Sequence, residues 1–238
     1  MPVIERGDVR IQYFEEGSGF PVLALAPGGM RSTASAWGRA AWNPVTELAD
    51  RYRVITMDQR NAGGGTTAPV TGVESWASYT ADQLAVLDHL GVDRFHVVGM
   101  CIGGPFILGL LKAVPERVDK TVVLQTIGRD ANREAFEQLF DGWATGLAEE
   151  HPEAGPAEWA AYRKAMYEGD ETLFSVPDSF LATVTRPMLV LQGDDQHHPR
   201  SASQLLASSV PGARLVEQWK DEADLPGTRR VIAEFLAG

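Results

Sequence analysis

The chain has a single cysteine, Cys101, among 238 residues. One cysteine excludes an internal disulfide, and no group of cysteine and histidine has the spacing of a zinc site. We therefore expect no metal and no cofactor. A lone thiol suits a reducing compartment, which predicts a cytoplasmic protein.

Positive charge is also scarce, since 21 basic residues face 32 acidic ones and the formal net charge is −11. This balance argues against nucleic acid and against an anionic membrane surface as partners. The first ten residues have no apolar run of signal-peptide length, and no later segment is apolar enough to span a bilayer. We expect a small-molecule substrate, while the sequence does not define an oligomeric state.

Hydrophobic residues make up 44% of the chain, enough for one well-buried domain. A hairpin is expected over residues 3–15, followed by short apolar runs that alternate with helical patterns. This alternation predicts an α/β fold with a mostly parallel eight-stranded sheet covered by helices on both faces. The expected strands are 21–26, 51–57, 95–98, 120–125, 187–192 and 213–219, and the expected helices are 76–90, 102–113, 199–209 and 226–236.

About sixty residues interrupt the alternation, with helical patterns over 130–147 and 157–167. We interpret residues 126–185 as a helical lid inserted into a core formed by 1–125 and 186–238. Trp143 and Tyr162 in this segment are candidate substrate-binding residues. The same aromatic spacing is also typical of ordinary helix packing.

The segment Val97-Val98-Gly99-Met100-Cys101-Ile102-Gly103-Gly104 is the strongest local signal. It has the form of a nucleophile elbow, in which a strand ends, a nucleophile occupies a strained turn and a helix follows. Glycines flank the nucleophile because side chains there would clash with the strand and the helix. The helix N-terminus favours a thiolate, so the pKa of Cys101 should fall below its free value of about 8.5. The alternative is that Cys101 is a small buried hydrophobe.

Four motifs together resemble the α/β-hydrolase superfamily: Pro27-Gly28-Gly29, Asp58-x-Arg60-Asn61-x-Gly63, Gly99-Met100-Cys101-Ile102-Gly103 and Gly193-Asp194-Asp195 through Pro199. The resemblance covers residues 10–238 and implies an α/β-hydrolase fold. It also implies an elbow nucleophile, an oxyanion hole and then an acid and a histidine in chain order. By position, the oxyanion donors would be the N–H groups of Ile102 and Gly29, with Met30 a further candidate.

The resemblance implies that Asp195 is the acid, with its neighbour Asp194 as the alternative. Asp58 and Arg60 are expected to be structural. Met30 and Met100, beside the loop and the nucleophile, are the remaining candidate substrate-binding residues.

The chain departs from the family in its histidines, because none follows His198 and the loop after the eighth strand, 220–227, has none. His89, His96 and His151 are expected to be structural or solvated. His197 and His198 lie within three residues of Asp195, and we favour His198 as the base because Pro199 fixes its entry into the next helix. Asp195, or Asp221 from the vacated loop, would orient the imidazole; the alternative is that both histidines face water.

The leading hypothesis is a cofactor-independent hydrolase in which Cys101 attacks an ester, thioester, lactone or activated ketone. A second is acyl transfer, cyclisation or a lyase reaction at the same site, favoured by the missing histidine. A third is a ligand-binding protein on an inactive hydrolase scaffold. Dienelactone hydrolases are similar in having cysteine as the nucleophile, but they keep histidine in the usual loop.

Overall fold

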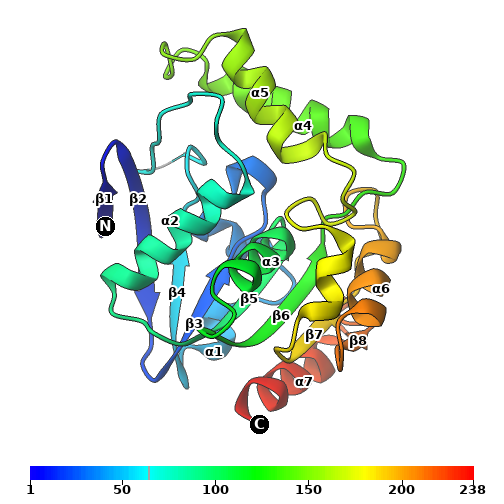
Figure 1. The fold of residues 1–238 in the computed structure, drawn as a ribbon. Helices are drawn as coiled ribbons and strands as arrows, with labels where there is room; N and C mark the ends of the chain where they lie inside the picture. Colours follow the sequence, from blue (N-terminus) through cyan, green and yellow to red (C-terminus); the bar gives the residue numbers. More distant parts are fainter. Residues whose placement is uncertain (64) are drawn as a thin grey trace.

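A computed structural model describes residues 1–63 and 65–238 and contains one eight-stranded sheet (Figure 1). Its strand order is β1-β2-β4-β3-β5-β6-β7-β8, in which only β1 and β2 run antiparallel to their neighbours. The strands are β1 Val3–Arg6, β2 Val9–Glu16, β3 Phe20–Leu25, β4 Tyr52–Met57, β5 Phe95–Cys101, β6 Val118–Thr126, β7 Met188–Leu191 and β8 Arg214–Val216. The predicted α/β fold is therefore confirmed.

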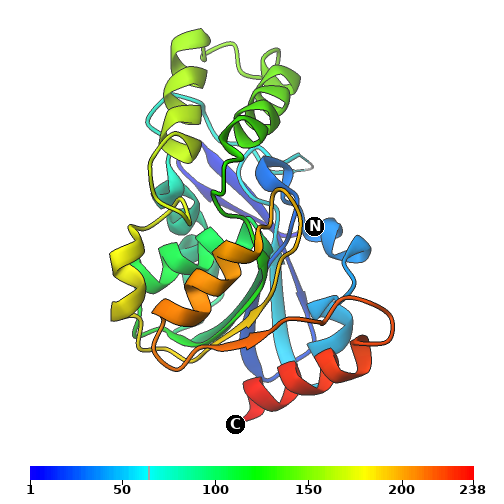
Figure 2. The same ribbon diagram turned by 90° about the vertical axis from the view of Figure 1, so that its right-hand side faces the viewer.

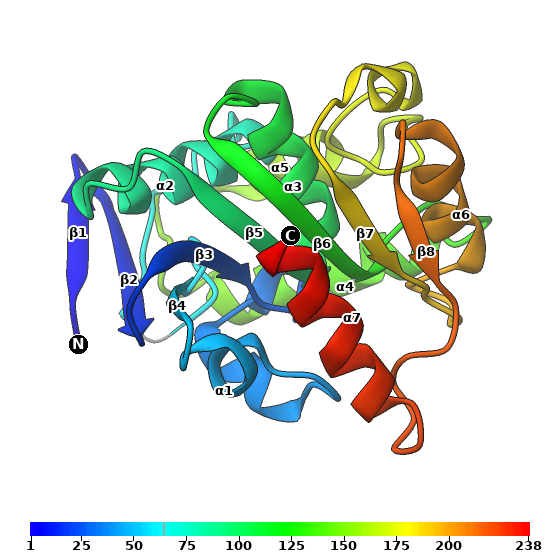
Figure 3. The same cartoon turned by 90° about the horizontal axis from the view of Figure 1, so that it is seen from below.

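Helices cover both faces of the sheet, as the view from below shows (Figure 3). One face packs against α2 (Trp76–His89), α3 (Gly103–Ala113) and α6 (Arg200–Ser209), and the other against α1 (Pro44–Leu48) and α7 (Leu225–Ala237). The central strands are apolar throughout because both faces are buried. Leu23 and Val97 point into the first layer, whereas Val22 and Val98 point into the second.

The expected elements agree with the structure to within a few residues, apart from the last strand. Predicted over 213–219, it covers only Arg214–Val216. The chain then leaves the sheet edge, and Trp219 turns back into the core, where its indole N–H donates to the carbonyl of Gln192 at 2.8 Å. A long loop consequently joins β8 to α7 (Figure 2).

Helices α4 (Arg133–Leu147) and α5 (Pro156–Tyr167) lie beyond the end of the sheet at which the parallel strands finish (Figures 1 and 2). Hydrogen bonds tie them to the core. The indole of Trp143 donates to the carbonyl of Asn61 at 3.0 Å, and that of Trp76 donates to the carbonyl of Met166 at 2.9 Å. Each helix is thus joined to the rest of the chain by a buried indole hydrogen bond.

No helix in the part of the chain that the structure describes is both long enough and apolar enough to cross a membrane.

The loop that follows β4 contains Gly64, which lies outside the described residues. In the rest of that loop, Arg60 pairs with the fully buried Asp82 at 2.7 Å, and Asp58 accepts the N–H of Ala34 at 2.7 Å. Both contacts are internal to the scaffold, which fits the structural roles expected for Asp58 and Arg60.

Candidate active site

Cys101 stands at the tip of β5 with a backbone φ of 60°. This left-handed conformation is strained for a residue with a side chain, and such strain persists only where the surroundings enforce it. A Cβ on Gly99 would lie 2.6 Å from the carbonyl oxygen of Gly103, and one on Gly103 would lie 2.8 Å from that of Leu25. The flanking glycines are therefore required for the strand and helix to meet at this turn.

The surroundings of the Cys101 sulfur favour its thiolate. Burial alone would raise the pKa of the thiol, but His198 and the backbone N–H groups of Gly28 and Ile102 act in the opposite direction and lower it. Two backbone N–H groups and an imidazole thus all favour the charged form of the Cys101 sulfur. This is the arrangement expected for an activated thiol beside an oxyanion hole.

The imidazole is held by a tight loop between β7 and α6. The carboxylate of Asp195 accepts the backbone N–H groups of His197 and His198 at 2.9 and 3.0 Å, and Nδ1 of His198 lies 2.8 Å from its Oδ2. Three hydrogen bonds to one carboxylate fix both the loop and the ring. Gly193 is needed there because a Cβ would lie 2.7 Å from that of His198.

His198 favours the charged form. Burial opposes the charge, but the Cys101 thiolate and the Asp195 carboxylate outweigh it and raise the pKa of the imidazole to about 9. In turn, although burial works against its charge, the His198 imidazole and the loop N–H groups lower the pKa of Asp195. The buried Nε2 of His198 makes no hydrogen bond of ordinary geometry to any described residue. The imidazole therefore acts on the thiol through its charge, and not through a hydrogen bond of ordinary geometry.

A cavity of about 250 Å³ opens onto the thiol. Apart from Arg31 and the two histidines, its side chains are apolar or aromatic. The lining residues are Gly28, Gly29, Met30, Arg31, Cys101, Ile127, Phe136, Leu139, Tyr167, His197 and His198. We call this space the thiol cavity; its size and character suit a short apolar group.

The structure brings together Cys101, His198, Asp195, Ile102, Gly29 and Met30 from the residues proposed on sequence. The sequence did not single out Gly28 as a donor, but its backbone N–H group lowers the pKa of the Cys101 thiol, while Gly29 follows it in the cavity wall. Gly28 has a φ of 127°, which favours glycine. A Pro-Gly-Gly sequence alone does not distinguish the two N–H groups.

Three other candidates lie elsewhere. The Trp143 side chain is buried among Phe140, Trp159 and Tyr162. The Tyr162 hydroxyl is hydrogen-bonded to that of Tyr79 at 2.6 Å, so both residues pack the helices rather than line the thiol cavity. Met100 points to the opposite side of the sheet, into a second cavity. The sequence contains a signal for this position of Met100, because consecutive residues of a strand face opposite ways and Met100 directly precedes Cys101 in β5.

The remaining acids and histidines have other partners. Asp194 contacts Lys220, and Asp221 lies in the loop after β8, where its backbone carbonyl accepts the N–H groups of Asp224 and Leu225. His197 packs edge-on against Phe136 at 5.7 Å, and His151 pairs with Glu153 at 2.7 Å. His96 is buried in β5, where desolvation lowers its pKa to about 4. Among the described residues no group of three histidine, cysteine, aspartate or glutamate side chains could hold a metal ion.

Comparisons with known proteins agree with this architecture. Residues 21–185 match the family model described as alpha/beta hydrolase fold. A putative carbamate hydrolase RutD of Azorhizobium caulinodans is 30% identical, covering 100% of this chain and 97% of the relative. A 2-hydroxy-6-oxononadienedioate/2-hydroxy-6-oxononatrienedioate hydrolase of Burkholderia vietnamiensis is 26% identical, covering 98% and 93%.

Two solved structures superpose over nearly the whole chain. Est816, described as an N-acyl homoserine lactone degrading enzyme, has a TM-score of 0.68 and 25% identity and covers 99% of this chain and 98% of its own. The enol-lactonase from Burkholderia xenovorans LB400 has a TM-score of 0.71 and 18% identity, with complete coverage of both chains. The second likeness concerns the fold alone.

Proposed function

The chain belongs to the alpha/beta hydrolase family and is a hydrolase of that type, and from this premise we propose that it uses Cys101 as its nucleophile. Asp195 and His198 complete the catalytic group, and the substrate is a small ester, thioester, lactone or activated ketone. The observation that carries the proposal is the thiol cavity, which is lined by both Cys101 and His198, with Nδ1 of that histidine 2.8 Å from the Asp195 carboxylate.

The resting state is a thiolate–imidazolium pair. The pKa of the Cys101 thiol is lowered despite burial, while that of His198, likewise against its burial, is raised to about 9. Both shifts favour transfer of the thiol proton to the imidazole. A preformed thiolate needs no base for its first attack, unlike a serine hydroxyl.

Acylation begins when the thiolate adds to the substrate carbonyl and forms a carbon–sulfur bond. The carbonyl electron pair moves onto oxygen, which accepts hydrogen bonds from the N–H groups of Gly28 and Ile102. Removing one such donor typically costs about 3 kcal/mol in barrier height. Collapse of the adduct breaks the bond to the leaving group, which takes the proton from His198.

Deacylation uses the neutral His198 as the base. It removes a proton from water, whose oxygen attacks the thioester carbon, and the thiolate leaves as the imidazolium forms again. Acyl transfer at the same site was favoured by the absence of a base. An imidazole beside the thiol removes that reason, and it also weakens the case for an inactive binding scaffold.

The names of the similar proteins bear on the reaction class. They name a carbamate hydrolase, a hydrolase of a dienedioate and an enzyme that degrades a lactone. All three descriptions fit small molecules that carry a carbonyl group. Together with a thiol cavity of about 250 Å³ they support a small substrate.

The test is direct detection of an acyl-enzyme. Wild type incubated with 4-nitrophenyl acetate should gain one acetyl group on Cys101, seen by intact mass and peptide mapping, and should release nitrophenolate. Cys101→Ala should lose turnover and acetylation while keeping the circular dichroism spectrum and melting temperature of wild type. Undiminished turnover by the alanine variant would remove Cys101 from the mechanism.

A further inference from the structure

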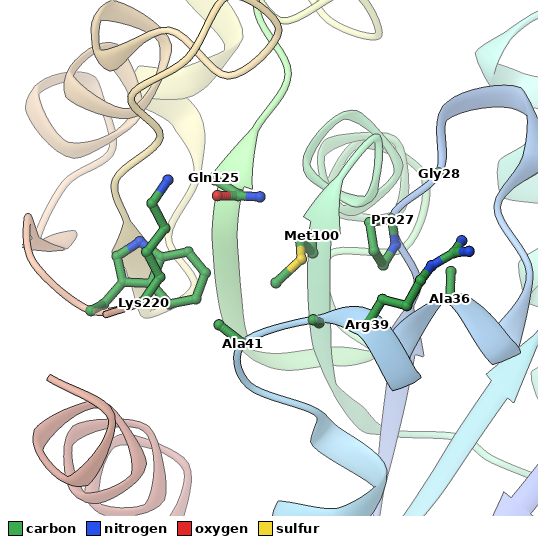
Figure 4. Close-up of a pocket in the computed structure, with 10 residues that line it drawn as sticks. Pro27, Gly28, Ala36, Arg39, Ala41, Met100, Gln125 and Lys220 are labelled. Carbon is green, nitrogen blue, oxygen red and sulfur yellow. The ribbon is translucent and has the colours of Figure 1, made fainter. Parts of the chain in front are cut away.

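A second cavity, of about 310 Å³, lies on the other side of the elbow from the thiol cavity. The residues that line it include Gly28, Arg39, Met100, Gln125, Trp219 and Lys220 (Figure 4). We call it the far-side cavity. Trp219 and Lys220 come from the loop after β8, the loop in which the family resemblance places a histidine.

The charged residues in its lining, Arg39 and Lys220, are both cationic. Figure 4 shows them on opposite sides of the space, with Met100 between them and the amide of Gln125 nearest Lys220. Arg39 is exposed and pairs with no acid among the residues that the structure describes. Its guanidinium is therefore free to bind a ligand.

Lys220 contacts Asp194, which leaves two of its three N–H donors for other partners. The nearby acids Asp194, Glu217, Asp221 and Asp224 line a separate cavity that shares Trp219 and Lys220 with the far-side cavity. The acids therefore line that neighbouring cavity, together with Arg200 and Lys220, whereas the far-side cavity has no acidic residue in its lining. In a chain with a net charge of −11, a wholly cationic lining is a local exception that favours an anion.

The far-side cavity and the thiol cavity share Gly28. Its N–H group is one of the two that lower the pKa of the Cys101 thiol, so we place the substrate carbonyl beside Gly28, at the wall common to both cavities. His198 lines the thiol cavity and does not line the far-side cavity. Since the leaving group must reach His198, it occupies the thiol cavity, and the acyl part extends past Gly28 to the far side.

We propose that the far-side cavity binds a carboxylate carried on the acyl part of the substrate, with Arg39 and Lys220 as its cationic partners and Gln125 as a neutral donor. This inference rests on the proposed function for the orientation of the substrate. The substrate class is then a monoester or other activated monoacyl derivative of a short dicarboxylic acid. The leaving group is small and apolar.

Binding without chemistry is the first test, because it stays meaningful if Cys101 is not the nucleophile. Monomethyl adipate and dimethyl adipate are titrated into Cys101→Ala by calorimetry, with Trp219 fluorescence as a second signal. The monoanion should bind at least tenfold more tightly than the neutral diester, since hydrogen bonds to charged groups are the stronger ones. Equal affinity of the two esters would overturn the proposal.

Charge-matched variants locate the site. In the Cys101→Ala background, Arg39→Gln and Lys220→Gln should each weaken monomethyl adipate at least fivefold. Arg214→Gln, an exposed residue at the start of β8, removes the same charge at the opposite end of the strand and should leave the affinity unchanged. The assignment would be wrong if the variant that combines Arg39→Gln and Lys220→Gln bound monomethyl adipate as tightly as Cys101→Ala alone. It would also be wrong if Arg214→Gln weakened binding as much as Arg39→Gln and Lys220→Gln do.

Kinetics separate this inference from the proposed function. The ratio of kcat/KM for mono-4-nitrophenyl adipate over its methyl ester should exceed ten and should fall towards one in Arg39→Gln. Turnover of both esters with a ratio near one would overturn the carboxylate site and leave the Cys101 mechanism standing. Binding of the monoanion with no turnover of either ester would do the reverse.

Discussion

At the scale of single residues, the Asp195 carboxylate contacts both the backbone of its own loop and the ring of His198. The carboxylate accepts two backbone N–H groups and faces Nδ1 of His198, so it shapes the loop and orients the ring together. His197, which precedes His198, contacts this carboxylate only through its backbone N–H group, and its ring packs on Phe136. Two adjacent histidines therefore have different duties.

This difference predicts unequal effects of two alanine substitutions. His198→Ala should lower kcat/KM by at least about a hundredfold, the lower range for general base catalysis, and should slow alkylation of Cys101 by iodoacetamide at pH 7. His197→Ala removes only a cavity wall, so its effect should be several times smaller and alkylation should keep its rate. The reverse order of the two effects would exchange their roles.

The pKa values predict a bell-shaped pH profile. The thiolate–imidazolium pair exists above the lowered pKa of Cys101 and below that of His198, about 9. Both shifts run against burial, and their direction widens the pH range of the pair. Accordingly, kcat/KM should rise as the thiol loses its proton and fall as pH passes about 9.

Iodoacetamide provides the control for this profile. Alkylation needs the thiolate but no protonated imidazole, so its rate should rise with pH and then level off, without the fall near pH 9. In His198→Ala the rising limb should move to higher pH. A falling limb that persists in the turnover of His198→Ala would assign that proton to another group.

At the scale of elements, the loop from Gly193 to Pro199 depends on a buried neighbour, Asn132. Its amide donates to the carbonyls of Gly128 at 2.9 Å and Gln196 at 2.6 Å, and its oxygen accepts the N–H of Asp130 at 2.9 Å. One side chain thus ties the loop that carries His198 to the end of β6. Asn132 is a positioning residue.

Asn132→Ala should therefore lower kcat/KM about tenfold and shift the falling limb of the pH profile, because the carbonyls lose their donor and His198 loses its fixed place. Ser201→Ala is a matched control, since Ser201 makes an exposed hydrogen bond to Asp130 in the same region. A variant of Asn132 that is less stable but keeps the wild-type pH profile would contradict the positioning role.

Local patterns allowed some elements to be predicted and left others open. The elbow is encoded within five residues, because glycine spacing and the strand-to-helix change are local properties. The His198 choice rested on its distance along the chain from Asp195 and Pro199. The helical aromatics Trp143 and Tyr162 were harder, since helical spacing shows that a face is buried but not what covers it. The N–H of Gly28 depends on a backbone angle that sequence does not specify.

At the scale of the whole molecule, a buried ion pair joins distant segments. Asp82 in α2 is fully buried and pairs with Arg60 at 2.7 Å and with Arg6 of β1 at 2.6 Å. It thereby connects the first hairpin, the loop after β4 and a helix on one face. The resemblance gave a structural role for Arg60, but its partner could not be found from sequence because 22 residues separate them.

Asp82→Ala should lower the free energy of unfolding by about 3 kcal/mol or more, because it leaves the buried Arg60 charge unpaired. For a chain of this size the melting temperature should fall by about 2–4 °C for each kcal/mol. Arg6→Gln, at a half-exposed end of the same network, should cost at most about 1 kcal/mol. Thermal unfolding followed by calorimetry compares the two, and equal losses would contradict this account.

Asp195 and His198 lie three positions apart, inside one turn that a single glycine and a single proline delimit. Because the acid–base pair is confined to so few residues, the loop from Gly193 to Pro199 can be transferred as one segment into a relative with a longer chain. The β8 connection, relieved of proton transfer, is then free to diversify and to set what the enzyme accepts. Mutational drift in that connection should alter selectivity long before it silences the chemistry.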